Sequence, residues 1–463
     1  MISNDLVQKV LASAVARGGE FAEIFAEDKK TSSASLDDGK VEELSSGISR
    51  GAGIRVVVGD TTGFAHTADL SESGLLKAAE AARSVALSNQ GGVKIVEVGN
   101  PDVYSARSLA INPSQIGKQE KIQLLERMDS IARSTSGSIR QVSAGYGDSF
   151  RQILVANTDG VFATDQQVRT RIAVSTIAFG DTGMQTGYET AAYTMGFEMF
   201  EDVDVEELAR MAAERAIRKL SARPAPSGIL PVVLKGGSGG ILFHEACGHG
   251  LEADHIIKDS SVYKGKIGEQ VASPLITLVD DGTVDQQWGT ANIDDEGKPS
   301  QRNVLIENGV LTDYMWDGLR ARKSNRSSSG NGRRQSYQHL PMVRMTNTYL
   351  LEGSETPEAL ISNTDHGIYV ARLGGGQVNT ATGDFVFGMT EAYLIENGEI
   401  THPLRDANLI GNGPEVLKKI DGVASDFSIT PGTCGKDGQS VPVGCGQATL
   451  RITGVTIGGT ANG

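Results

Sequence analysis

The stretch that decides the local fold is residues 229–254, ILPVVLKGGSGGILFHEACGHGLEAD. Residues 229–234 are apolar apart from one proline, which predicts a short strand, and Pro231 places the first half of that strand at a sheet edge. The glycine-rich residues 236–240 predict a tight turn. Residues 241–247 then predict a short helix, on which His244 and Glu245 are adjacent.

The second histidine of this stretch, His249, lies five positions after His244. In a common zinc-peptidase motif the two histidines are four residues apart, about 40° from each other on one helix face. Five residues correspond to about 140° in a regular helix, so the pair can share a metal only if the helix widens or ends between them. Gly248 and Gly250 flank His249 and permit such a break.

The residue types suit hydrolysis assisted by a metal ion. Neutral imidazoles bind zinc, and a third protein ligand leaves one position open for water. The metal lowers the pKa of that water, and a neighbouring carboxylate takes its proton as general base. Glu245 is the candidate base, because it adjoins a ligand without joining the ligand set. The alternative interpretation is a buried histidine pair satisfied by hydrogen bonds.

Position in the sequence leaves the third ligand open. Cys247 lies three residues after His244, on the same face of a regular helix. Cys434 lies in a glycine-flanked turn, and Lys436 close by favours a thiolate. His255 and His402 are weaker candidates. Cys445 lies in a strand-like stretch and is expected to pack as a small hydrophobe. A phosphate-binding loop at 236–240 is disfavoured, because no Gly-Lys-Ser/Thr follows it.

The regions before this stretch mix helices and strands. Residues 1–25 predict an amphipathic helix broken at Gly18-Gly19, and residues 75–87 and 122–132 predict further helices. Residues 153–162 predict a hairpin. Asp204 begins another helix in a capping-box pattern with Glu207. A Pro-rich linker follows, so we expect domains at 1–105, 106–222 and 223–463.

The last of these regions is rich in hairpin signals. Asn308-Gly309 and Asn397-Gly398 each separate strand-like flanks. Residues 324–338 are rich in Ser, Gly, Asn and Arg, and predict either a mobile surface loop or a lid. We expect an α+β fold, with a mixed α/β N-terminal half and a largely antiparallel β C-terminal domain that carries the motif helix.

Composition narrows the classes of function. The net charge is −14 over 463 residues, which disfavours nucleic acid as a ligand. Three cysteines are too few for a disulfide scaffold, and neither a secretory signal nor a long apolar run is evident. We therefore expect a cytoplasmic protein with no membrane partner.

Three stretches together resemble the TldD/PmbA family, and specifically its motif-bearing TldD-like subunit. They are residues 243–254 with the His-Glu-x-x-x-His signature, residues 339–348 (HLPMVRMTNT), and residues 434–444 (CGKDGQSVPVG). The resemblance covers the whole chain, with its regions in family order.

This resemblance implies a metallopeptidase whose metal, zinc or another divalent transition metal such as iron, is bound by His244, His249 and Cys434. Glu245 matches the family's motif glutamate. The implied substrates are unfolded or flexible peptides, for degradation or leader processing. The implied assembly is a dimer with a PmbA-like subunit or with a second copy. An old family label, modulator of DNA gyrase, implies instead a non-enzymatic protein that binds a toxin, an antitoxin or gyrase.

Overall fold

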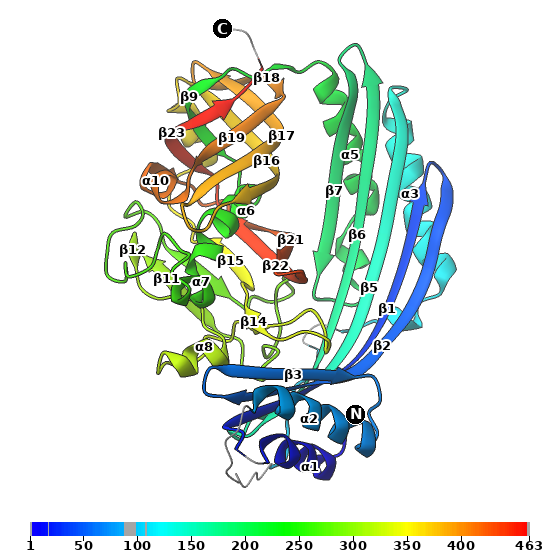
Figure 1. Ribbon diagram of the computed structural model, residues 1–463. Helices are drawn as coiled ribbons and strands as arrows, with labels where there is room; N and C mark the ends of the chain where they lie inside the picture. The colour runs from blue at the N-terminus through cyan, green and yellow to red at the C-terminus, as the bar shows by residue number, and fades with distance from the viewer. Residues whose placement is uncertain (1, 17, 88–98, 107–108, 461–463) are drawn as a thin grey trace.

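The computed structural model describes residues 2–16, 18–87, 99–106 and 109–460. It is an α+β protein, as expected, in which a long antiparallel sheet from the N-terminal half faces a β-rich C-terminal domain (Figure 1). No helix in these ranges is long and apolar enough to cross a membrane.

The long sheet runs through both N-terminal regions. Its order is β3-β2-β1-β5-β6, with β4 and β7 also paired to β6. Strand β1 pairs with β5 from Glu23 to Asp37, so residues from 1–105 and 106–222 share one sheet, and the division of the chain into three domains stays a prediction. The strands are β1 (Phe21–Asp37), β2 (Lys40–Val58), β3 (Thr61–Thr67), β4 (Asp102–Val103), β5 (Ile139–Asn157), β6 (Phe162–Gly180) and β7 (Gly183–Tyr193).

Helices cover the face of this sheet that points away from the C-terminal domain. One apolar core joins α1 and α2 to β1, β2 and one end of β5, and a second joins α3 and α5 to β5, β6 and β7. Asp204 caps α5 by accepting hydrogen bonds from the backbone N–H groups of Glu206 and Glu207, as its capping pattern predicted. The helical segments are α1 (Asn4–Val15), α2 (Glu72–Ala86), η1 (Pro113–Gln115), α3 (Lys118–Thr135), α4 (Met199–Asp202) and α5 (Val205–Leu220).

The expected helix over residues 1–25 is wrong in its second half. Helix α1 ends at Val15, and β1 begins at Phe21, which lies opposite Val57 of β2. Gly18 has a φ of 113°, which only glycine adopts readily and which ends the helical path. The apolar run after it is buried by strand pairing, so tertiary structure decides its conformation.

The C-terminal domain contains two sheets. In the first, β16-β9-β23-β19-β17 follow one another, and pairing of β16 with β17 closes these strands into a ring. Three short strands extend it. The members are β8 (Arg223–Pro224), β9 (Gly228–Leu234), β16 (His366–Val378), β17 (Asp384–Glu396), β18 (Glu399–Arg405), β19 (Ala407–Asn412), β20 (Ile420–Val423) and β23 (Leu450–Gly458).

The second sheet of this domain has the order β12-β11-β10-β15-β22-β21 and is antiparallel except for β15 with β22. Strands β13 and β14 form a separate pair. The strands are β10 (Leu278–Asp281), β11 (Arg302–Glu307), β12 (Val310–Leu311), β13 (Gly332–Arg333), β14 (Met342–Val343), β15 (Asn347–Leu350), β21 (Ser428–Lys436) and β22 (Gln439–Gln447). The helical segments of the domain are α6 (Gly240–Phe243), η2 (His244–Gly248), η3 (His249–Leu251), α7 (Ala253–Ile257), α8 (Gly318–Lys323), α9 (Pro357–Ser362) and α10 (Gly413–Lys418).

Both Asn-Gly hairpins are confirmed. Asn308-Gly309 joins β11 to β12, and Asn397-Gly398 joins β17 to β18. All four residues have positive φ, between 47° and 83°. This is the conformation that a two-residue turn needs to match the twist of its strands.

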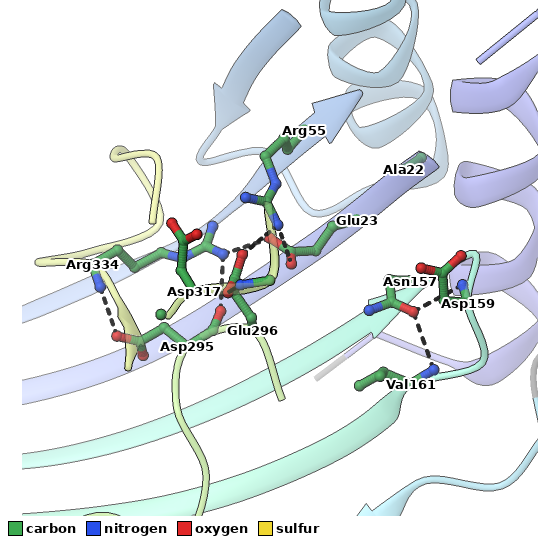
Figure 2. Close-up of polar contacts among 12 residues, drawn as sticks. Ala22, Glu23, Arg55, Asn157, Asp159, Val161, Asp295, Glu296, Asp317 and Arg334 are labelled. Carbon is green, nitrogen blue, oxygen red and sulfur yellow. Dashed lines mark hydrogen bonds and ion pairs between the residues drawn. The ribbon is translucent and has the colours of Figure 1, made fainter. Parts of the chain in front are cut away.

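Residues 324–338 form part of the contact between the long sheet and the C-terminal domain. Residues 330–334 are buried, so a mobile surface loop is the wrong description of this part. The Arg334 guanidinium lies 2.5 Å from a Glu23 carboxylate oxygen, and Arg55 bridges Glu23 and Glu296 at 2.9 and 2.7 Å (Figure 2). Burial of these ions requires such pairing, which local composition does not show.

Candidate metal centre

The strand-turn-helix stretch forms as its sequence predicts. Strand β9 leads into the glycine-rich turn and then into α6. A Cβ atom on Gly240 would lie 2.5 Å from the Cys445 carbonyl carbon and from the Gly446 nitrogen. Helix α6 therefore packs directly on the backbone of β22, and this contact requires glycine.

The helix widens where the two histidines need it to widen. Residues His244–Gly248 form a π-helical turn, in which the His249 N–H donates to the His244 carbonyl five residues earlier. Such turns occur mostly as single insertions in helices, frequently at functional sites. The imidazole rings are 5.1 Å apart and nearly perpendicular. The two histidines could share a metal only if the helix widened or ended between them, and the structure shows that it widens.

Cys434 reaches the histidines from β21. Its sulfur lies 3.3 Å from Nε2 of His249, and one ligand atom each from His244, His249 and Cys434 lie within 4.8 Å of one another. Cys247 is outside this cluster. It is buried beside Tyr263, and burial raises the pKa of its thiol to about 12.

The three side chains form a charged cluster. Burial disfavours the Cys434 thiolate, but the two histidines outweigh that effect and lower the pKa of the thiol to about 4. Burial disfavours protonated His249, yet the charge of Glu252 and the contact with Cys434 raise its pKa to about 10. These shifts favour a thiolate beside protonated imidazole in the metal-free site.

These donors fit a borderline metal ion such as zinc. Imidazole nitrogen and thiolate sulfur are both zinc donors, and three protein ligands leave one position open. In addition, Nδ1 of buried His244 has no hydrogen-bond partner among the described residues. Buried polar atoms are nearly always satisfied, so this one is consistent with a missing ligand.

Buried acids hydrogen-bond to His249 and to its neighbour Lys436 outside the proposed ligand set. Glu252 is fully buried, and its Oε2 atom accepts hydrogen bonds from Nδ1 of His249 at 2.9 Å and from Nζ of Lys436 at 2.8 Å. Lys436 also donates to Asp254 at 2.8 Å. Glu252, Asp254 and His255 could hold a cation by distance alone, but the Lys436 ammonium already supplies the positive charge there. The sequence gives no local signal for Glu252, and Lys436 was expected only to favour the Cys434 thiolate.

Glu245 lies at the open side of the cluster. One of its carboxylate oxygens is 3.8 Å from Nε2 of His249, and its side chain is 23% exposed, unlike those of the buried ligand candidates. Cys445 packs with Val441 and Val443 as expected, but its thiol also interacts with His244, a contact that its strand-like surroundings do not predict. His402 lies on β18, away from the cluster.

A cavity of about 570 Å³ lies near the cluster, although His244, Glu245, His249 and Cys434 are not part of its lining. It lies between β7 and the C-terminal domain, and its walls include Tyr188, Ile241, Arg372, Thr433 and Cys445. It therefore brings solvent or a ligand next to the cysteine strands and the start of the motif helix.

Comparison with known proteins agrees with this description. Residues 22–86, 111–220 and 227–459 match domain 1, the central domain and the C-terminal domain of the PmbA/TldA metallopeptidases. The chain is 44% identical to a Metalloprotease TldD homolog of Haemophilus influenzae over 452 residues, covering 96% of this chain and 94% of that one. It is 26% identical to a Zinc metalloprotease TldD homolog of Saccharolobus solfataricus, covering 97% and 99%.

A solved structure shares the fold. TldE from Thermococcus kodakarensis superposes with a TM-score of 0.80 at 20% identity, covering 98% of this chain and 99% of that one. The sequence likeness to several chains named metalloproteases defines a peptide-bond hydrolase that depends on a metal ion. The chain belongs to the PmbA/TldD family of metallopeptidases.

Proposed function

We propose that the chain hydrolyses unfolded or flexible peptides, with His244, His249 and Cys434 as metal ligands and Glu245 as the general base. The observation that carries the proposal is the convergence of the three donors across a π-helical turn, with a partly exposed carboxylate beside them. Zinc suits the donor set and is named for one relative. Iron is the alternative.

A bound divalent ion would supply Lewis acidity and a water molecule of lowered pKa. Glu245 takes the proton of the attacking water at a carboxylate oxygen and passes it to the leaving amine. Glu252 holds His249 through Nδ1 and so keeps Nε2 directed at the cluster. Lys436 balances the charge of Glu252 without touching the substrate side.

The substrate is an extended chain that pairs with a strand edge. Strand β21, which carries Cys434, pairs only with β22 among the described residues, so no strand is paired with its other edge. Gly432 and Thr433 on this strand line the 570 Å³ cavity. Backbone pairing reads little side-chain identity, which suits degradation or leader processing of varied peptides.

The same proposal includes a cytoplasmic dimer, with a PmbA-like subunit or with a second copy. The TldE-like fold supports such a pairing, because it shows that two sequence-divergent chains can present the same architecture. Three unpaired cysteines suit a reducing compartment.

The test is Glu245→Gln in purified, metal-loaded protein. The amide keeps the size and removes the base, so metal content should stay at one equivalent while peptide turnover falls about 10²–10⁴-fold. His244→Ala and Cys434→Ala should lose the metal as well. Turnover within about tenfold of the parent would show that Glu245 is not the base.

The competing function is a non-enzymatic modulator that binds a toxin, an antitoxin or gyrase. Such binding would survive Glu245→Gln unchanged and would need no metal. Absence of turnover in the parent protein, together with binding that is insensitive to this substitution, would favour that function.

A further inference from the structure

A second cavity, of about 220 Å³, lies between the long sheet and the C-terminal domain, and its lining has more basic than acidic residues. We call it the cationic pocket. Two acids, Asp294 and Asp295, are in its wall. Its five basic residues are Lys29 of β1, Arg151 of β5, Arg169 of β6, and Arg333 and Arg334 of the buried segment 330–334.

Two of these arginines have no counter-charge in direct contact. Arg169 donates to the carbonyls of Trp288 and Thr290 and to the amide oxygen of Gln167, at 3.0–3.2 Å. Arg333 donates to two backbone carbonyls, at 2.5 and 2.8 Å. Both are less than a tenth exposed, and neither forms an ion pair with a carboxylate of the described chain. Isolated buried ions are unfavourable, so such cations indicate a missing anion.

The acids in the wall are bound to groups other than the Arg169 and Arg333 side chains. Asp295 binds the Arg151 guanidinium at 2.9 Å and accepts the backbone N–H of Arg334 at 2.8 Å. Asp294 accepts backbone N–H groups from Glu296, Lys298 and Gly332. In contrast, Nη2 of Arg151 is buried without any hydrogen-bond partner in the described structure.

The electrostatics agree with an excess of positive charge. Burial, helped by the charges of Arg333 and Arg151, lowers the pKa of Arg169 to about 9. Burial and Arg344 lower the pKa of Arg333 to about 10, although Asp295 acts in the opposite direction. Lys29 lies directly opposite Arg151 in the sheet register, and burial and that charge lower its pKa too. Glu27, which pairs with Arg151 at 2.5 Å, acts on Lys29 in the opposite direction.

The cationic pocket is next to the proposed substrate site. Thr433, the residue before Cys434, and Trp288 line both this pocket and the 570 Å³ cavity. A chain paired with β21 in the large cavity therefore has its end within reach of Arg169 and Arg333.

We propose that the cationic pocket binds the C-terminal carboxylate of the peptide substrate. This assignment rests on the proposed peptidase function. Planar guanidinium groups bind carboxylates through paired N–H donors, and the pocket has room for a chain end but not for a folded domain. The enzyme then prefers peptides with a free C-terminal carboxylate, although the rest of the site contacts only the peptide backbone.

The test compares two peptides of one sequence without Asp or Glu, one ending in a free carboxylate and one in an amide. The parent enzyme should cleave the acid with a kcat/KM at least about tenfold higher than the amide. In Arg169→Gln, and separately in Arg333→Gln, this ratio should fall towards one, because the acid loses a charged contact that the amide never makes. Arg140→Gln, an exposed arginine on β5, should keep the parent's ratio.

A binding measurement separates this proposal from the peptidase function. Calorimetric titration of the Glu245→Gln protein needs no turnover, and the acid should bind at least about tenfold more tightly than the amide. Equal binding of the two peptides overturns the carboxylate assignment even where peptidase activity is present. Inorganic phosphate that saturates the pocket without displacing the acid peptide overturns it as well. Tighter binding of the acid peptide, together with no peptide turnover by the parent enzyme, would support the carboxylate assignment and contradict the proposed peptidase function.

Discussion

Replacement of Glu252 by glutamine should weaken metal binding without changing any proposed ligand. One Glu252 oxygen accepts from both His249 and Lys436, while Oε1 is buried without a partner. The substituted amide can keep both hydrogen bonds through its carbonyl oxygen, but it loses the charge that favours the His249 orientation. Changes in such outer partners cost about 10–100-fold in metal affinity. Because the hydrogen bonds remain, we expect the lower end, about tenfold or about 1.4 kcal/mol.

Asp254→Asn is the matched control. Asp254 is buried like Glu252 and binds Lys436 at the same 2.8 Å distance, but it makes no hydrogen bond to His249. Both variants weaken one charged hydrogen bond of Lys436, so both should lose about 1–3 kcal/mol of unfolding free energy in the metal-free state. Only Glu252→Gln should also lose affinity.

The assay is competition for Zn²⁺ between the protein and a chromophoric chelator, with urea unfolding of the metal-free proteins in parallel. We expect a dissociation constant about tenfold higher for Glu252→Gln and within about threefold of the parent for Asp254→Asn. Equal weakening in both variants would mean that Lys436, rather than the contact with His249, transmits the effect. Unchanged affinity in Glu252→Gln would refute the supporting role altogether.

Two further predictions concern the substrate and the long sheet. One protein offered in native and in denatured, alkylated form should be cleaved only in the unfolded form, measured by mass spectrometry of the products; equal cleavage would point to a surface-exposed site. Gly187→Ala should destabilise the fold by about 1–3 kcal/mol in urea unfolding, because its Cβ would lie 1.8 Å from the Ala212 carbonyl oxygen of α5. Gly147→Ala, with open space around its added Cβ, should stay within about 0.5 kcal/mol, and a similar loss in both would contradict this explanation.

Local chemistry predicted those elements whose conformation is set within a few residues. The turns at Asn308-Gly309 and Asn397-Gly398 and the cap at Asp204 depend on neighbouring backbone only, and all three formed as expected. The run from Phe21 is buried by pairing with β2 and β5, which neighbouring residues do not show. A helix was therefore expected where a strand forms. Segment 330–334 looked like a polar loop for the same reason, since Glu23 lies 311 residues before Arg334.

The candidate site divides in the same way. His244, Glu245 and His249 were recognisable from their spacing, and the required widening of the helix followed from that spacing alone. The choice of Cys434 over Cys247 did not follow from spacing, because the i+3 relation assumes a regular helix and the π turn changes it. Glu252 was missed because its role depends on Lys436, which is 184 residues away.

The widened turn and the cysteine position depend on the same packing. A π turn is rarely stable by itself, so tertiary contacts must hold it. Added Cβ atoms at Gly240, Gly248 and Gly413 would lie within 2.1–2.5 Å of β22, of the Met345 side chain and of the Ala246 carbonyl oxygen. These close approaches hold the turn from three sides. Strand β22 is the hairpin partner of β21, so the surface that holds the turn also positions Cys434. Metal binding and folding of this domain should therefore be coupled, since any loosening of the helix from β22 separates the histidines from the thiolate.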